Sequence, residues 1–181
     1  MKELSLSILD IVQNSLVAGA GNISVSVAAD VPSDLLTITV TDDGCGMDKE
    51  FLARVIDPFT TTRTTRKVGL GIPLFKLAAE QSGGRLEITS EVGKGTEVKA
   101  EFSLSHIDRP PLGDMGQTLA LLINGNPDVH FTYTHSAALG SLVLDTDEMK
   151  LVLGDIPLDS PEIFEWIAEY VNSGLAETGP I

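Results

Sequence analysis

The sequence predicts an α/β sandwich, in which one face of a sheet packs on helices and a small α+β appendage follows at the C-terminus. Two observations support this fold class. Apolar residues recur at helical spacing in some segments and at alternating spacing in others, and these segments follow the order helix, hairpin, helix, loop, helix, hairpin. A chain of 181 residues is long enough for one domain with such an appendage.

The first hundred residues are punctuated by glycine and proline at the ends of these segments. Gly19 and Gly21 end the first helix, Pro32 lies in the turn of the first hairpin, and Pro73 lies in the first turn of a later helix. The predicted elements are a helix over 4–16, strands over 23–27 and 36–40, a short helix over 48–56, an exposed loop over 60–67, a helix ending before 83–84, and strands over 86–91 and 96–104.

The composition changes after residue 104. Residues 105–116 are rich in proline and glycine and are typical of a linker. Beyond them we expect helices near 117–124 and 161–173 and strands near 129–135 and 141–145. The predicted organisation is therefore a domain over 1–104, a linker over 105–116 and a small α+β unit of unknown role over 117–181.

The charge of the chain excludes several kinds of partner. Twelve Lys and Arg against 26 Asp and Glu give a net charge of −14, which argues against nucleic acid and anionic membranes as partners. A single Cys cannot form an intramolecular disulfide. Glu3 and Asp10 interrupt the apolar N-terminal segment, so it does not resemble a secretion signal. We therefore expect a cytoplasmic protein.

Three polar motifs are candidates for chemistry. Asp10 and Asn14 share one helix face, which is either a solvated face or a place for a hydrated magnesium ion. Asp42-Asp43-Gly44-Cys45-Gly46-Met47 follows a predicted strand. This segment is either a plain turn or a loop that approaches a flat ligand, with Asp42 better placed than Asp43 to accept from an amino group.

The third motif combines cations with a glycine-rich helix start. Arg63, Arg66 and Lys67 precede Val68-Gly69-Leu70-Gly71, where free N–H groups and a helix dipole would favour phosphate. The alternative is a solvated basic loop. The sequence lacks GxxxxGK[ST] and a complete GxGxxG. Gly93-Lys94-Gly95-Thr96, taken alone, is a hairpin turn.

In order and spacing, these motifs resemble the boxes of the GHKL, or Bergerat-fold, ATPase superfamily, which groups gyrase, heat-shock chaperone ATPases, mismatch-repair ATPases and histidine kinases. LDIVQNSLVAGA resembles the N box, VTDDGCGM the G1 box, DPFTTTR the F box, VGLGIPLFKLAAEQSGG the G2 box and GKGTEV the G3 box. Together they cover residues 1–104. The resemblance implies a Bergerat-fold α/β sandwich that binds ATP with Mg²⁺.

The resemblance also implies roles for individual residues. Asn14 would contact magnesium, Asp42 would accept from the adenine amino group, and Asp10 lies where catalytic members carry a glutamate base. Arg63, Arg66 and Lys67 would lie in or beside a lid over the nucleotide, and Thr96 would lie near the adenine. The implied nucleotide-binding residues are Asn14, Asp42, Gly44, Gly46, Met47, Arg63, Arg66, Lys67, Gly69, Leu70, Gly71 and Thr96.

Departures from the family pattern leave two functions open. Asp10 is shorter than glutamate, and Val17 replaces an acid common in hydrolytic members, so we expect slow turnover. The first hypothesis is a kinase-like protein that passes the γ-phosphoryl group to a partner protein or hydrolyses ATP slowly. The second is a regulatory module that ATP gates without chemistry. The whole chain also resembles stand-alone ATP-binding proteins encoded beside iron-hydrogenase subunits, which makes a hydrogenase-related partner an expectation.

The remaining residues of note have structural interpretations. His106, His130 and His135 are expected to be structural or exposed, with the last two on opposite faces of a strand. Cys45 lies in the loop expected at the adenine, where it is either a small buried residue or a thiol whose alkylation is slowed by bound nucleotide. Trp166 and Tyr170 are four residues apart on the last helix, which favours core packing over a partner-binding stripe. The oligomeric state stays open.

Overall fold

The computed structural model describes residues 3–56 and 71–181, which form helices and strands in alternation. The elements are α1 (Leu4–Val17), β1 (Asn22–Asp30), β2 (Leu35–Asp42), α2 (Lys49–Ile56), α3 (Gly71–Gln81), β3 (Arg85–Glu91), β4 (Gly95–Ser103), α4 (Met115–Gly125), β5 (His130–Ala137), β6 (Gly140–Asp145), α5 (Thr146–Leu153) and α6 (Pro161–Thr178). Every element predicted over residues 4–56 and 71–104 is present, with ends shifted by a few residues at most.

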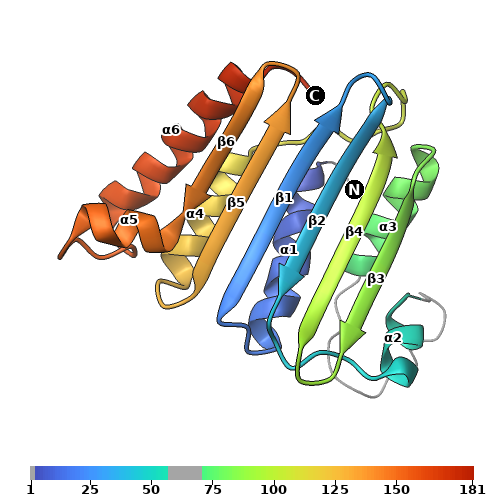
Figure 1. The fold of residues 1–181 in the computed structure, drawn as a ribbon, viewed down its shortest axis with the longest axis horizontal. Helices are drawn as coiled ribbons and strands as arrows, with labels where there is room; N and C mark the ends of the chain where they lie inside the picture. The colour runs from blue at the N-terminus through green and yellow to red at the C-terminus, as the bar shows by residue number, and fades with distance from the viewer. Residues whose placement is uncertain (1–2, 57–70) are drawn as a thin grey trace.

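One six-stranded sheet runs through the molecule in the order β3-β4-β2-β1-β5-β6 (Figure 1). Neighbouring strands are antiparallel except β1 and β5, which pair in parallel. The sheet is therefore mixed, as the resemblance to the Bergerat fold implies. A parallel neighbour requires a crossover, and here the described residues between β1 and β5 contain β2, β3, β4 and the helices α2, α3 and α4.

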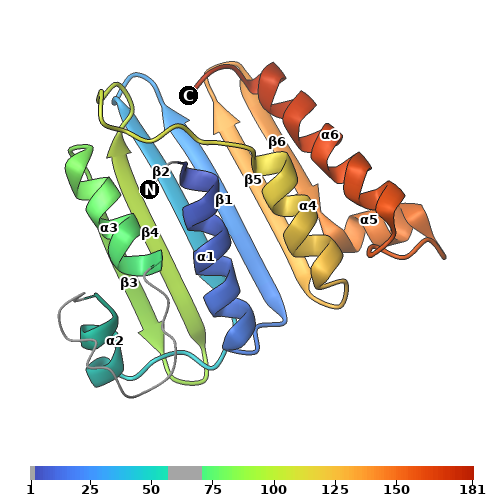
Figure 2. The ribbon, with the colours of Figure 1, turned by 180° about the vertical axis from the view of Figure 1, so that it is seen from behind.

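Helices α1, α3, α4 and α6 cover one face of this sheet (Figure 2). The strands alternate accordingly, since residues such as Val25, Ile38 and Val98 are buried beneath the helices while their chain neighbours point to the other face. Among residues 3–56 and 71–181, no helix combines the length and the hydrophobicity needed to cross a membrane.

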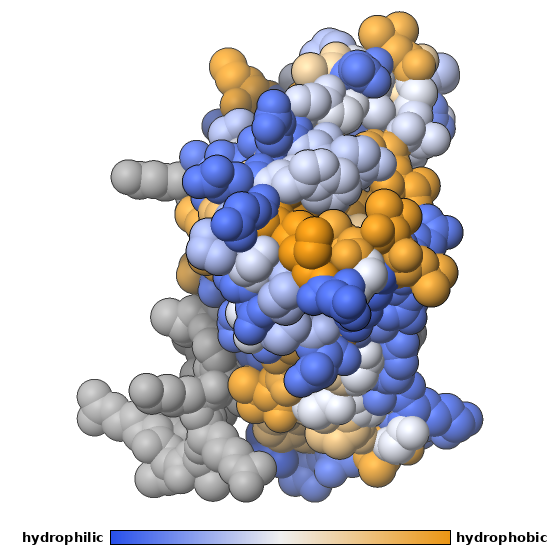
Figure 3. Space-filling view, turned by 90° about the vertical axis from the view of Figure 1, so that its left-hand side faces the viewer, coloured by the Kyte–Doolittle hydropathy of each residue, from blue (hydrophilic) through white to orange (hydrophobic). Residues whose placement is uncertain are grey.

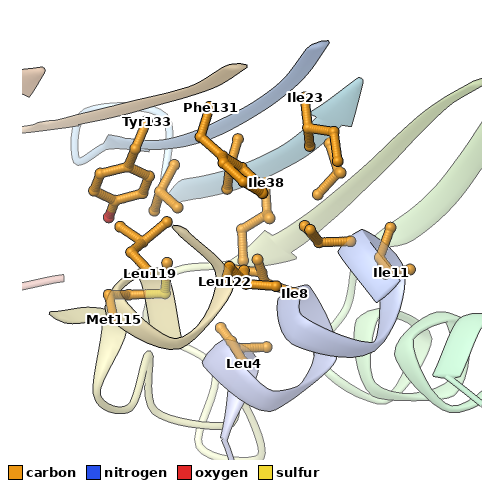
Figure 4. Packing of buried hydrophobic residues seen from close by; sticks show 14 of the residues in the cluster. Leu4, Ile8, Ile11, Ile23, Ile38, Met115, Leu119, Leu122, Phe131 and Tyr133 are labelled. Carbon is orange, nitrogen blue, oxygen red and sulfur yellow. The ribbon is translucent and has the colours of Figure 1, made fainter. Parts of the chain in front are cut away.

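The core lies between the helix layer and the middle of the sheet. Leu4 and Ile8 of α1 and Leu119 of α4 face Phe131 and the other apolar residues of the sheet (Figure 4). All four side chains are nearly or fully buried. Burying a side chain of this size stabilises the fold by about 1.5–3 kcal/mol.

The C-terminal segment contributes to the same sheet and the same core. The register of β5 against β1 places Asn22 opposite His130 and Ala28 opposite Ser136. Residues 117–181 contain the helices and strands expected of the α+β appendage, but its strands extend the main sheet instead of forming a second one. Helix α5 is an addition that the sequence did not predict, although Asp145 caps it by accepting from the amides of Asp147 and Glu148.

The segment expected to be a linker is attached to the start of α1. The Leu4 amide donates to the carbonyl of Pro111 and the Ser5 amide to that of Leu112, at 2.9 and 2.8 Å. These bonds satisfy N–H groups that a helix N-terminus leaves without intrahelical partners. Near the other end of the segment, Asp34 accepts from Ser105. Residues 105–112 are thus held against the domain at both ends.

A substitution in β5 tests whether the two parts of the sheet unfold together. Phe131→Ala removes a fully buried ring from the shared core and is expected to cost about 3–5 kcal/mol of unfolding free energy. The unfolding curves from far-UV circular dichroism and from fluorescence of Trp166, the one tryptophan, are expected to shift together. Ile107→Ala, at a position 94% exposed, is the control. A shift confined to the tryptophan signal would indicate an independent C-terminal unit.

Candidate functional site

A cavity of about 270 Å³ opens at the end of the sheet where β2 finishes, between the last turns of α1 and helix α2. Its volume is close to the lower end of the range for small-molecule sites, about 300–1,000 Å³. Apolar side chains form most of its wall, and a few polar groups converge on it. The lining includes Ile11, Asn14, Ser15, Val17, Ala18, Asp42, Cys45, Gly46, Met47, Phe51, Val55, Ile72, Thr96 and Val98.

Asp42 supplies the carboxylate of this cavity and is held in place from two directions. The hydroxyl of Ser15 on α1 donates to Oδ2 at 2.6 Å, and the Gly44 amide donates to Oδ1 at 2.9 Å. A carboxylate has about four lone-pair sites, so these two bonds leave acceptor capacity for a ligand. Asp42 is therefore an oriented acceptor at the wall of a largely apolar cavity.

The neighbouring carboxylate, Asp43, does not line the cavity and has a different task. It accepts from the Asn22 side chain at 2.6 Å and from the amides of Gly21 and Asn22 at 2.8 and 2.9 Å. The Asn22 side-chain bond, followed by that residue's amide, lowers the pKa of Asp43 below its ordinary value of 3.8. Asp43 thus ties the loop after β2 to the start of β1.

Glycine is required where this loop crosses the β3–β4 hairpin. Gly46 has a φ of +67°, and a Cβ there would lie 2.0 Å from the carbonyl oxygen of Glu91. Gly44 is constrained by space alone and less severely, because a Cβ there would lie 2.8 Å from the Cβ of Ala18. The Gly93 amide donates to the carbonyl of Cys45 at 2.8 Å and fixes the crossing. The two glycines predicted in this loop therefore allow the close approach that forms the cavity floor.

Ser90 on β3 connects the two loops around the cavity. Its hydroxyl lies 2.8 Å from Oγ1 of Thr96, accepts from the Met47 amide at 2.8 Å and donates to the carbonyl of Gly95 at 2.9 Å. Thr96 and Met47 are predicted from the sequence, whereas Ser90 and Ser15 are not. Neither serine belongs to a recognisable motif, and only the paired strands bring Ser90 opposite Thr96.

Asp10 lies one helical turn before Asn14 on α1 and is exposed. It does not belong to the lining of the cavity in the described structure. Gly71, the first residue of α3, packs directly on it, since a Cβ at Gly71 would lie 2.8 Å from the Cβ of Asp10. The N-terminus of α3, which carries partial positive charge, therefore faces the part of α1 that carries Asp10.

The predicted site residues fall into three groups. Five of them line the cavity: Asn14, Asp42, Gly46, Met47 and Thr96. Gly44, Gly71 and Asp10 lie next to it without being part of the lining, as described above. Arg63, Arg66, Lys67, Gly69 and Leu70 lie outside the described residues. Of the two alternatives for Cys45, the buried residue is wrong, because the side chain is exposed at the cavity. The protection of its thiol by nucleotide stays a prediction.

A chain of hydrogen bonds leads from the cavity loop to the C-terminal segment. Asn22, already bonded to Asp43, has its Oδ1 3.1 Å from Nδ1 of His130. Nε2 of His130 lies 3.0 Å from Asp145, the cap of α5. Burial alone would raise the pKa of Asp145, but the His130 bond and the Glu148 and Asp147 amides outweigh it and lower that pKa. The chain crosses the ends of β2, β1, β5 and β6.

Residues 2–106 match a family described as histidine kinase-, DNA gyrase B-, and HSP90-like ATPase. The protein is a member of this ATPase family. Membership implies ATP as the ligand of the domain, and it agrees with the boxes recognised over residues 1–104. The mixed sheet with helices on one face is the Bergerat fold that those boxes predict.

Similar proteins include bacterial sensor proteins. A putative sensor protein of Shewanella frigidimarina is 29% identical over 109 residues, which are 59% of this chain and 17% of that protein. The non-motile and phage-resistance protein of Caulobacter vibrioides is 36% identical over 97 residues, which are 51% of this chain and 12% of that protein. Sensor histidine kinase AruS of Pseudomonas aeruginosa is 34% identical over 94 residues, which are 48% of this chain and 9% of that protein. The chain thus spans less than a fifth of these relatives.

A solved structure shares the fold at lower identity. The N-terminal domain of a DNA repair protein superposes with a TM-score of 0.56 and 14% identity, over 80% of this chain and 53% of that one. The coverage exceeds the extent of the family match, so part of the C-terminal segment is included in the superposition. At this identity, the likeness describes the fold of the ATPase alone.

The Asp43 tie makes stability dependent on pH in a defined direction. The pKa of Asp43 is lower in the folded protein than its ordinary value of 3.8. Its ionised carboxylate therefore stabilises the folded state above pH 3.8, and this stabilisation is lost as the pH falls through the folded pKa. Asp43→Asn is expected to destabilise the protein near neutral pH, since an amide cannot accept all three bonds. Urea unfolding at a series of pH values should show this difference shrinking below pH 3.8. A difference that stays constant down to pH 2 would contradict the role.

Proposed function

We propose that this family member binds ATP with Mg²⁺ in the cavity beside Asp42 and transfers the γ-phosphoryl group to a partner protein or hydrolyses ATP slowly. The observation that carries the proposal is the oriented Asp42 carboxylate in a cavity of suitable size with apolar walls. Similarity to sensor kinases supports a regulatory role. A hydrogenase-related partner stays a prediction from sequence.

The cavity fits a purine in its chemistry. An amino group on a flat ring needs an acceptor at the end of a slot with apolar walls, and Asp42 provides that acceptor. Ile72 and Val98 supply apolar surface for the ring, and Thr96 supplies a hydroxyl within the same lining. We assign the adenine to this position, with Gly44 and Gly46 allowing the loop to close on it.

Asn14 is the residue that we assign to magnesium. Its side chain makes no hydrogen bond within residues 3–56 and 71–181, and it belongs to the lining of the cavity. Within the same residues, no three His, Cys, Asp or Glu side chains gather to hold a metal ion. A magnesium ion would therefore depend on Asn14, phosphate oxygens and water, which is the kind of coordination that this ion favours. Bound there, it would neutralise charge on the phosphates.

Asp10 would orient and deprotonate the attacking group, and Gly71 with the start of α3 would hold the phosphates near it. Around the phosphates we also propose the residues predicted from the sequence in or beside the lid, which are Arg63, Arg66, Lys67, Gly69 and Leu70. The exposure of Asp10 and its absence from the cavity lining favour a second function, an ATP-gated module that binds a partner without chemistry.

Labelled nucleotide distinguishes the two functions. The protein is incubated with Mg²⁺, ATP labelled on its γ-phosphate and an extract of its own cells, and the label is followed. We expect label on a protein, and its stability to acid separates Ser/Thr from His acceptors. Asn14→Ala should abolish this transfer. Tight ATP binding with no label on protein and no release of phosphate would instead support the gated module.

Asp42→Asn tests the adenine position. It removes a charge-assisted hydrogen bond worth about 1.5–3 kcal/mol, so the affinity for ATP measured by calorimetry should fall by about one to two orders of magnitude. Discrimination against GTP should weaken as well. Asp43→Asn is the matched control, because its carboxylate lies outside the cavity lining. Equal losses in both variants would mean that the loop's conformation, and not the Asp42 carboxylate, determines affinity.

A further inference from the structure

The edge of the sheet farthest from the nucleotide cavity exposes apolar and aromatic side chains. Trp166 and Tyr170 of α6 stack with ring centroids 5.0 Å apart and planes at 11°, and they expose 47% and 38% of their surface. The Tyr170 hydroxyl donates to the carbonyl of Val143 on β6 at 3.0 Å, and Val143 is 52% exposed. We call these three residues the aromatic edge.

The apolar surface continues beyond these three residues. Helix α5 lies at the same edge (Figure 1) and exposes Leu151 and Val152 at 85% and 88%. Viewed from this side, a patch of hydrophobic residues lies near the middle of the face with hydrophilic residues around it (Figure 3). An exposed apolar patch of this kind, flanked by polar residues, is typical of a protein interaction site. Tryptophan and tyrosine are the residues most often dominant in such sites.

Charge defines the chemistry of the partner. Residues 115–181 contain ten Asp and Glu against one Lys and no Arg. The one lysine, Lys150, forms an ion pair with Asp147, with Nζ 3.7 Å from Oδ1. Glu162, Glu165 and Glu169 are exposed on α6 beside the stacked rings. Such a rim repels acidic proteins and attracts Lys and Arg, which also bind favourably over the faces of tryptophan and tyrosine.

The edge also limits how a partner can bind. β6 is an edge strand, and strand addition would need its outward backbone groups. The carbonyl of Val143 already accepts from Tyr170, so an added strand would have to share this carbonyl with the Tyr170 hydroxyl or displace that bond. A partner that contacts side chains alone leaves it intact. An amphipathic helix contacts side chains alone, through the apolar residues on one of its faces.

We propose that the aromatic edge, with α5 beside it, is a docking surface for a basic amphipathic helix of a partner protein. Apolar residues of that helix cover Trp166, Tyr170 and Val143, and its Lys or Arg residues pair with the acidic rim of α6. The proposal stands independently of the nucleotide, because the edge shares no residue with the cavity.

The test uses a synthetic helical peptide of Leu and Lys, about five turns long, with all Leu on one face. The peptide contains no tryptophan, so any change in emission comes from Trp166, the one tryptophan of the chain. At physiological salt and without nucleotide, we expect a saturable shift of the emission and one-to-one binding by calorimetry. A Leu/Glu peptide of the same pattern, and a Lys/Ser peptide of the same charge, should give neither.

Variants locate the binding. Tyr170→Ala and Val143→Lys are each expected to weaken peptide binding at least tenfold. Ile107→Lys changes the charge equally at a site that is 94% exposed and outside the edge, so it should bind within twofold of the natural protein. Circular dichroism and thermal unfolding confirm that each variant is folded.

Three outcomes would overturn the proposal. Equal weakening by Ile107→Lys, or binding of the Lys/Ser peptide with similar affinity, would show a general attraction to an acidic protein. Unchanged affinity in Tyr170→Ala would place the peptide elsewhere. A concentration-dependent dimer that is seen by sedimentation and lost in Val143→Lys would assign the edge to a second copy of this chain.

Discussion

Helix α1 contacts both the sheet and the nucleotide cavity, and a single orientation of the helix about its axis has to place the right side chains on each. The rest of the structure depends on this constraint. Its apolar stripe, with Leu4 and Ile8 fully buried, packs on the sheet. Once the stripe is in place, the next turn brings Ser15 within 2.6 Å of Asp42. The carbonyl of Ala18 then accepts from Cys45 and anchors the loop after β2. The packing that stabilises the domain therefore also positions the acceptor in the cavity.

Local patterns were sufficient to predict most elements, and of two adjacent aspartates the one preferred from the sequence, Asp42, lines the cavity. Its role at the adenine stays a prediction. Asp42 ends a strand whose alternate residues are buried, so its side chain was expected to reach the site, and Asp43 was not. The partners that orient Asp42 could not be predicted in the same way. Ser15 is 27 residues away, and its contact depends on how α1 crosses β2. The five predicted residues over 63–70 lie outside the described structure, so their placement stays a prediction.

Longer-range features escaped the sequence for two physical reasons. The pairing of β5 with β1 joins segments about a hundred residues apart, and nothing local encodes such a parallel register. The expected core packing of Trp166 and Tyr170 is wrong for a different reason. Spacing of four residues places both on one helix face, but it does not say which face is buried. Ile163, Ile167 and Val171 occupy the core face of α6, and the aromatic pair is left half-exposed.

The parallel pairing of β1 with β5 also determines how much of the chain is needed for a domain without an exposed β1 edge. The family match ends at residue 106, before β5 begins. A chain ending there would leave β1, nine residues long, as a new outer strand with unpaired backbone groups. It would also lose α4, whose Leu119 and Leu122 cover the adjoining core. A strand exposed in this way is a template for association between chains. The segment after residue 106 therefore covers a strand edge that would otherwise be open to pairing with other chains.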